Sequence, residues 1–185
     1  MIAYKERGEA VLAAPLADLL AFTLLAALNR ARQANEGPLE GIQPVLVVPV
    51  PSRRAAVRGR GHDHVSTLAD GVVRRLRPYG VSARLWPALR QRRKVTDQAG
   101  LSSSDRVANL AGSFSVPEGA ARDQGGAARV PSPADRVVIV DDVVTTGATL
   151  ADAARALRDA GATVPLAVTV AATRRISRND YGHRQ

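Results

Sequence analysis

The sequence predicts an α/β fold in which a parallel β-sheet is flanked by α-helices. Two short apolar runs, Val45–Val50 and Val137–Val140, are rich in β-branched residues, which is typical of parallel strands buried on both faces. Apolar residues recur at helical spacing over Val11–Ala34 and again over Val65–Leu76. The longer of these patterns is expected to form a packing helix beside the sheet.

The remaining elements give shorter signals. Residues 118–134 are rich in Gly, Ala, Pro and Arg without an apolar pattern, and we expect a flexible insertion there, with a polar basic tail over 173–185. In chain order, we expect a strand at Val81–Trp86, a short helix at Asp105–Leu110, a strand at Ser113–Val116, a helix from Leu150 that stops at Gly161, and a last buried strand at Thr163–Ala172.

The composition indicates one globular domain over residues 1–185. With 185 residues, 45% of them hydrophobic, the chain can bury a single large core. The absence of cysteine excludes disulfides and thiolate metal sites. The apolar stretch Pro15–Leu28 contains Asp18 and is shorter than the ~20 residues that span a bilayer. Because Met1–Ala10 also lacks a secretory pattern, we expect a cytoplasmic protein without a membrane span.

Two adjacent carboxylates, Asp141 and Asp142, follow the Val137–Val140 run, and the Thr- and Gly-rich stretch Thr145–Thr149 leads into the next helix. Backbone N–H groups at a helix N-terminus form an anion site suited to phosphate, and Gly147 permits close approach. Ionised carboxylates beside it are suited to accept hydrogen bonds from vicinal sugar hydroxyls near a magnesium ion. The pattern therefore predicts a sugar-phosphate site; the alternative is a surface turn whose Asp residues cap the helix.

Basic residues gather in two further segments. Arg53, Arg54, Arg58 and Arg60 follow the first strand, and if that strand neighbours Val137–Val140 they face the same crevice. Arg90–Gln98 is the most basic stretch and, lacking periodicity, is expected to be a loop that closes over a polyphosphate. The alternatives are a solvated basic loop for the first segment, and a nucleic-acid contact or an inert exposed loop for the second.

The pair His62 and His64 has the spacing of metal ligands, but no third ligand lies nearby in the sequence. We therefore expect these residues to be surface polar groups or hydrogen-bond partners rather than a metal site.

Three blocks resemble the ComF family, the competence-type or GntX-like type I phosphoribosyltransferases. Val137–Thr149 resembles the signature that binds phosphoribosyl pyrophosphate (PRPP), and Pro49–Pro51 with Arg58–Asp63 resembles the family's PVP and RxRG element. The resemblance extends from about Ala3 to about Ala172. Family members commonly begin with a cysteine-rich zinc ribbon, which this chain lacks, through natural loss or through the choice of start site. The third block comprises Arg90–Gln98, Leu101, Arg106, Asn109 and Phe114.

The resemblance implies a type I phosphoribosyltransferase fold with a small hood, and it implies roles for individual residues. Asp141 and Asp142 would hold the ribose hydroxyls of PRPP. The segment Thr145–Thr149 would seat the 5-phosphate, and the residues expected to bind PRPP beside the acidic pair are Val143, Thr145, Thr146, Gly147, Ala148 and Thr149. The pyrophosphate would contact Ser52, Arg53, Arg58, Arg60, Thr96 and Gln98, and the catalytic set would be Asp141, Asp142, Arg92, Arg93 and Lys94.

Two functions follow as hypotheses. The first is Mg²⁺-dependent transfer of a phosphoribosyl group from PRPP to a nitrogen acceptor, such as a nucleobase, which the sequence does not identify. The second is a non-catalytic PRPP- or nucleotide-binding accessory protein in DNA uptake, which contacts single-stranded DNA or protein partners. The net charge of +9 favours binding to polyanions, whereas the 3% aromatic content argues against binding by base stacking. An oligomer is compatible with either function.

Overall fold

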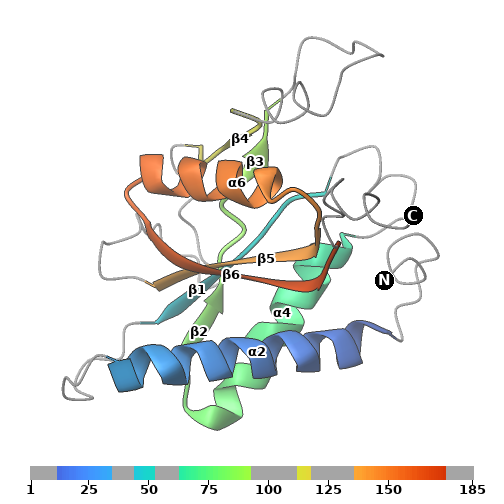
Figure 1. The fold of residues 1–185 in the computed structure, drawn as a ribbon, viewed down its shortest axis with the longest axis vertical. Coiled ribbons are helices and arrows are strands. Elements are labelled where there is room, and N and C mark those ends of the chain that lie inside the picture. Colours follow the sequence, from blue (N-terminus) through green and yellow to red (C-terminus); the bar gives the residue numbers. More distant parts are fainter. Residues whose placement is uncertain (1–11, 35–43, 53–62, 93–111, 118–135, 174–185) are drawn as a thin grey trace, which may run out of the picture.

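A four-stranded parallel sheet lies at the centre of the computed structural model, which describes residues 12–34, 44–52, 63–92, 112–117 and 136–173 (Figure 1). Its strands follow the order β2-β1-β5-β6. The strands are β1 (Val45–Pro49), β2 (Ala83–Leu85), β5 (Arg136–Val144) and β6 (Thr163–Ala172). The predicted parallel α/β architecture is therefore confirmed, and β1 does neighbour the strand of the acidic pair.

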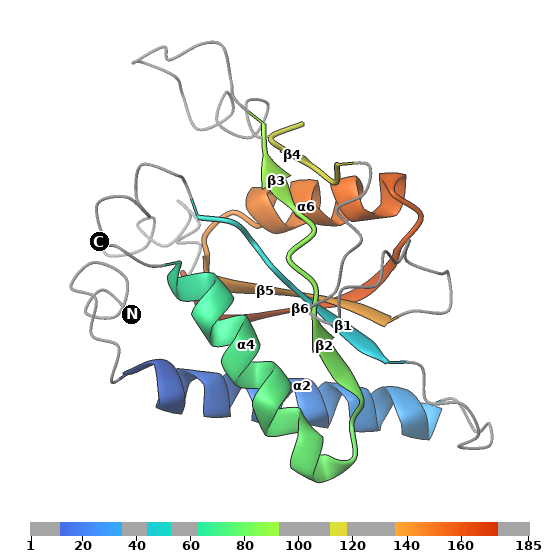
Figure 2. The same ribbon diagram turned by 180° about the vertical axis from the view of Figure 1, so that it is seen from behind.

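Helices cover both faces of this sheet. Helix α2 (Ala13–Ala34) and helix α4 (His64–Leu76) lie on one side, and α6 (Ala148–Asp159) lies on the other (Figures 1 and 2). Side chains alternate along each strand, so β1 sends Val45 and Val47 toward α2 and α4, and Leu46 and Val48 toward α6. Two cores result, one on each face of the sheet.

Helix α2 is, within the described parts of the chain, the one helix long and apolar enough to cross a membrane by length and composition. Its inner face carries Leu20, Leu24 and Leu28, which are buried in the core with residues of α4 and with Val168 of β6. This packing agrees with the predicted role of a helix that flanks the sheet.

Several segments differ from the sequence predictions. β2 is shorter than Val81–Trp86, and Trp86 is buried in the core on the α6 side of the sheet. The stretch predicted to be a loop from Arg90 begins instead as β3 (Arg90–Gln91), which pairs antiparallel with β4 (Phe114–Ser115). β6 has the predicted limits, but because it is the edge strand only Val168 of its ten residues is fully buried.

The strand of the acidic pair is longer than predicted. β5 continues through Asp141 and Asp142 to Val144, because it stays paired with β6 up to the pair formed by Val144 and Ala172. The acidic pair thus lies inside a strand rather than after it. A short 3₁₀ helix, η2 (Arg77–Tyr79), follows α4 and ends at Gly80. The helix expected at Asp105–Leu110, the insertion over 118–134 and the tail beyond Thr173 lie outside the described residues.

Candidate phosphoribosyl site

The predicted signature occupies the carboxyl edge of the sheet. Val140 of β5 is in register with Pro49 of β1, and Asp141 is in register with Thr169 of β6. The chain then bends over 145–147 and enters α6 at Ala148. The acidic pair and a helix N-terminus are therefore brought together at the edge where open α/β sheets bind ligands.

Both carboxylates of the pair are buried and held in place. Asp141 is 8% exposed and Asp142 is 4% exposed. The Asp142 amide donates to Oδ1 of Asp141 at 2.9 Å, and the Val143 amide donates to Oδ1 of Asp142 at 2.7 Å. The second oxygen of Asp142, Oδ2, lies 2.8 Å from Nε2 of the buried His64. Strand pairing and these bonds fix where the carboxylates point.

The turn that follows is open to solvent. Thr145 and Thr146 are exposed, and the Ala148 amide donates to Oγ1 of Thr146 at 3.3 Å. Gly147 is the residue before the first turn of α6; it has φ 79° and makes no side-chain cap hydrogen bond. At the other end, Gly161 and Ala162 donate to the carbonyls of Arg158 and Leu157, and Gly161 ends the helix as predicted.

The carboxyl end of β1 adds a second polar group to the same edge. Beyond β1, the Val50 amide donates to the Val140 carbonyl at 2.9 Å. This bond keeps the segment that leads to Ser52 beside β5. The Ser52 hydroxyl donates to Oδ1 of Asp63 at 3.2 Å and lies 3.5 Å from Nδ1 of His64. Asp63 in turn caps α4, since its carboxylate accepts from the Ser66 amide at 3.4 Å and the Ser66 hydroxyl at 2.9 Å.

His64 is therefore a hydrogen-bond partner within this edge, one of the two roles expected for it, and it begins α4 rather than standing in a loop. Sequence reasoning did not connect it with the signature. The available signal was its place just after Arg58–Asp63, at the start of a helix that follows the predicted pyrophosphate segment. In the part of the chain that the structure describes, no group of three His, Cys, Asp or Glu side chains could hold a metal ion.

A second polar cluster, which sequence reasoning missed, attaches the antiparallel pair of strands β3 and β4 to α6. Asp152 is 5% exposed and accepts from the amides of Gly112 at 2.8 Å and Phe114 at 2.9 Å, and from Nε of Arg155 at 2.8 Å. Arg155 also donates to the Phe114 carbonyl at 3.1 Å. Burial acts to raise the pKa of Asp152, but the bonds from Arg155, Gly112 and Phe114 outweigh it and lower the pKa overall.

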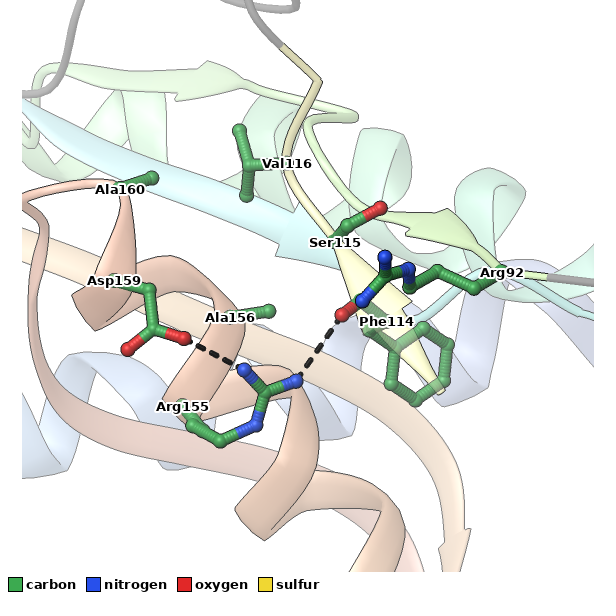
Figure 3. A pocket seen from close by; sticks show the side chains of 8 residues that line it. All are labelled: Arg92, Phe114, Ser115, Val116, Arg155, Ala156, Asp159 and Ala160. Carbon is green, nitrogen blue, oxygen red and sulfur yellow. Dashed lines mark hydrogen bonds and ion pairs between the residues drawn. The ribbon is translucent and has the colours of Figure 1, made fainter. Parts of the chain in front are cut away.

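Arg92, which belongs to the predicted catalytic set and to the stretch Arg90–Gln98, lies just past β3 and beside this cluster. It lines a pocket of about 200 Å³ between β4 and α6 (Figure 3). None of the residues Val137–Thr149 lines that pocket. The other pocket residues are Phe114, Ser115, Val116, Arg155, Ala156, Asp159 and Ala160.

The structure thus brings together Ser52, Asp141, Asp142 and the turn before α6. Arg92 is described but lies in the pocket between β4 and α6, which none of these residues lines. The remaining predicted site residues lie outside the described part of the chain: Arg53, Arg58, Arg60, Arg93, Lys94, Thr96 and Gln98, and with them His62.

The fold and this edge together define a parallel α/β protein in which a buried acidic pair and the N-terminus of α6 lie at the carboxyl edge of the sheet. The phosphoribosyl transferase domain family matches residues 92–184, which is half of the chain. The chain therefore belongs to the phosphoribosyltransferase family, and its fold is the type I phosphoribosyltransferase fold.

Individual relatives refine this assignment. Competence protein F of Haemophilus influenzae is 29% identical over 142 residues, which cover 77% of this chain and 55% of that protein. The chain is thus of the ComF type, and it spans about half the length of this relative. Adenine phosphoribosyltransferase of Mycobacterium avium is 52% identical over 52 residues, or 24% of this chain and 29% of that enzyme.

Among solved structures, the adenine phosphoribosyltransferase of Saccharomyces cerevisiae is similar, with a TM-score of 0.41 and 20% identity over 85% of this chain and 66% of the enzyme. A second adenine phosphoribosyltransferase has a TM-score of 0.42 and 20% identity, over 89% and 72% of the two chains.

Proposed function

We propose that the protein binds PRPP at the carboxyl edge of β5 and transfers its phosphoribosyl group to a nitrogen acceptor, with release of pyrophosphate. The observation that carries the proposal is the juxtaposition of a buried acidic pair, Asp141 and Asp142, with the turn 145–147 at the N-terminus of α6, where Thr145 and Thr146 are exposed. The first group suits ribose hydroxyls and the second suits a phosphate.

The electrostatics of this edge suit both ends of the ligand. The amides that begin α6, together with the hydroxyls of Thr145, Thr146 and Thr149, would surround the 5-phosphate. The carboxylates would accept from the ribose hydroxyls and stabilise the positive charge that grows on the ribose as the bond to pyrophosphate breaks. No side chain needs to form a covalent bond to the sugar.

Magnesium fits this arrangement as an ion held mainly by the oxygens of PRPP. Oδ1 of each carboxylate accepts a backbone amide and Oδ2 of Asp142 contacts His64, so the acidic pair alone does not offer a full oxygen shell. When bound, the ion would supply a Lewis acid for the departing pyrophosphate.

The remaining predicted residues have proposed roles on the pyrophosphate side. Ser52 lies at the edge already, and Arg53, Arg58, Arg60, Thr96 and Gln98 would join it around the pyrophosphate. Arg92, Arg93 and Lys94 would neutralise the leaving group from the catalytic loop.

The first test is calorimetric titration with PRPP and Mg²⁺. We expect micromolar binding by the wild-type chain and none by the Asp141→Asn, Asp142→Asn double variant. Asp159→Asn is the matched control, because it changes an exposed carboxylate at the far end of α6, outside the proposed site. This variant should bind PRPP as the wild type does. If the double variant binds PRPP as tightly as the wild type, the assignment of the site is wrong. If the wild type binds and the double variant does not, a screen of nucleobases for pyrophosphate release would identify the acceptor.

A second function is favoured by one specific finding, the similarity to competence protein F. In this role the protein would be a cytoplasmic, non-catalytic PRPP- or nucleotide-binding accessory in DNA uptake, and its net charge of +9 would attract single-stranded DNA or acidic partners. Oligonucleotide affinity that falls steeply with salt would support it. Absent or salt-insensitive binding, together with pyrophosphate release, would refute it.

A further inference from the structure

Four polar side chains form one continuous chain along the carboxyl edge of the sheet. Asp63, Ser52, His64 and Asp142 follow one another through contacts of 3.2 Å, 3.5 Å and 2.8 Å. Ser52 belongs to the predicted pyrophosphate segment, whereas Asp142 belongs to the ribose-binding pair. The side chain that joins these two groups is His64, which is 2% exposed.

The chemistry of each group sets the direction of the bonds. A carboxylate only accepts, so Nε2 of His64 must carry the hydrogen that it shares with Oδ2 of Asp142. Nδ1 faces the Ser52 hydroxyl, which can donate to the ring or to Oδ1 of Asp63. Since Oδ1 of Asp142 accepts the Val143 amide, the contact with His64 leaves the carboxylate no freedom to rotate.

We infer that His64 is a positioning residue that fixes the ribose-binding carboxylate of Asp142 through its Nε2. Its effect on PRPP rests on the proposed function. Its effect on Asp142 rests on the contacts alone. His64 is the first residue of α4, and Asp63 caps that helix, so the ring is held by a rigid element rather than by the ligand. Removal of an outer-shell group that orients a metal ligand typically changes affinity by about 10–100-fold, and we expect a change of the same order here.

Two substitutions separate the two nitrogens of the ring. The terminal amide of Gln reaches the position of Nε2, so His64→Gln keeps a donor for Asp142 and loses the contact with Ser52. The amide of Asn reaches only the position of Nδ1, so His64→Asn keeps the contact with Ser52 and loses the donor for Asp142. Both variants place a polar amide in the same buried site, and fluorescence of Trp86, the single tryptophan, reports whether each folds.

We expect His64→Gln to bind PRPP within about threefold of the wild type, and His64→Asn to bind about 10–100-fold more weakly. A purely structural role would reduce stability in both variants alike and leave their PRPP affinities equal. Equal affinities in two folded variants would therefore overturn the inference.

A measurement on the ligand-free chain separates this inference from the proposed function. Long-range ¹H–¹⁵N spectra resolve the nitrogens of the three histidines, and His64→Gln identifies the His64 signals by their loss. We expect a protonated Nε2 whose signal shifts in Asp142→Asn. If this signature is present while the wild type does not bind PRPP, the proposed function fails and the positioning of Asp142 stands. An Nε2 signal that is unprotonated, or unmoved by Asp142→Asn, would overturn the positioning role whatever PRPP does.

Discussion

Replacement of Asp152 by Asn should destabilise the attachment of the strand pair β3–β4 to α6. Oδ1 of Asp152 accepts from Gly112 and Arg155, and Oδ2 accepts from the buried Phe114 amide. In the Asn variant the carbonyl keeps the first two donors as a neutral acceptor, while the NH₂ group faces the Phe114 N–H and leaves it unsatisfied. One unsatisfied buried donor costs about 1–3 kcal/mol, and the two weakened bonds add to this, so we expect a loss of about 2–4 kcal/mol.

The assay is urea unfolding followed by the fluorescence of Trp86, which is buried in the same core cluster as Phe114. Asp159→Asn is the control, because Asp159 also pairs with Arg155 at 2.6 Å but its side chain is 63% exposed. Such a surface pair contributes about 0.5 kcal/mol. Equal urea midpoints for the two variants would refute the assignment of Asp152 as the residue that attaches the strand pair β3–β4 to α6.

The pH dependence gives a second check on Asp152. Its pKa in the folded state lies below the ordinary value of 3.8, so the unfolded chain takes up the proton first as pH falls. The stabilisation from this carboxylate is therefore complete at neutral pH and declines below pH 3.8. The difference in stability between the wild type and Asp152→Asn should narrow in that range, and a difference that stays constant down to pH 3 would contradict the direction of the shift.

Three further substitutions test the packing and the turn by thermal denaturation and urea unfolding. Leu24→Ala removes a fully buried side chain between α2 and its neighbours and should cost about 2–5 kcal/mol; a cost below 1 kcal/mol would contradict the described core. Gly71→Ala would place a Cβ 2.7 Å from that of Ala17, so overpacking of α2 on α4 should cost about 1–3 kcal/mol, and a stabilised variant would argue against that contact. Gly147→Ala meets no atom within 4 Å, so its cost of about 1–2 kcal/mol comes from the left-handed φ of 79° alone, and an unchanged melting temperature would refute that conformation.

Local patterns account for what the sequence predicted of the fold. The apolar runs of β1 and β5 and the periodicities of α4 and α6 lie within single segments, so neighbouring residues suffice to reveal them. The end of β5 was missed because two Asp residues look like the end of a strand. They remain in the strand because β6 pairs with it to Val144 and backbone amides satisfy the carboxylates. The exposure of β6 was missed because its place at the edge depends on the whole sheet.

The same division applies to the site. Asp141, Asp142 and the turn before α6 form a contiguous signature, and the structure places them at one edge. His64 was not connected with them because its partner Asp142 is 78 positions away in the sequence. The role of Asp152 was missed for the same reason, since the amides that donate hydrogen bonds to it belong to residues 38 and 40 positions earlier. Polar side chains whose partners are remote in sequence leave no periodic signal.

The central place of β5 has a consequence for how the molecule can be divided. The family match begins at residue 92, so that region contains β5, β6 and α6 but neither β1 nor α4. Expressed alone, it would carry the whole acidic signature on a strand with one open edge, and Asp142 would face water instead of an imidazole. A rigid site thus requires contacts between segments about eighty residues apart in the sequence. A second fragment that contains β1 and α4 would have to pair with the open edge of β5 to restore these contacts.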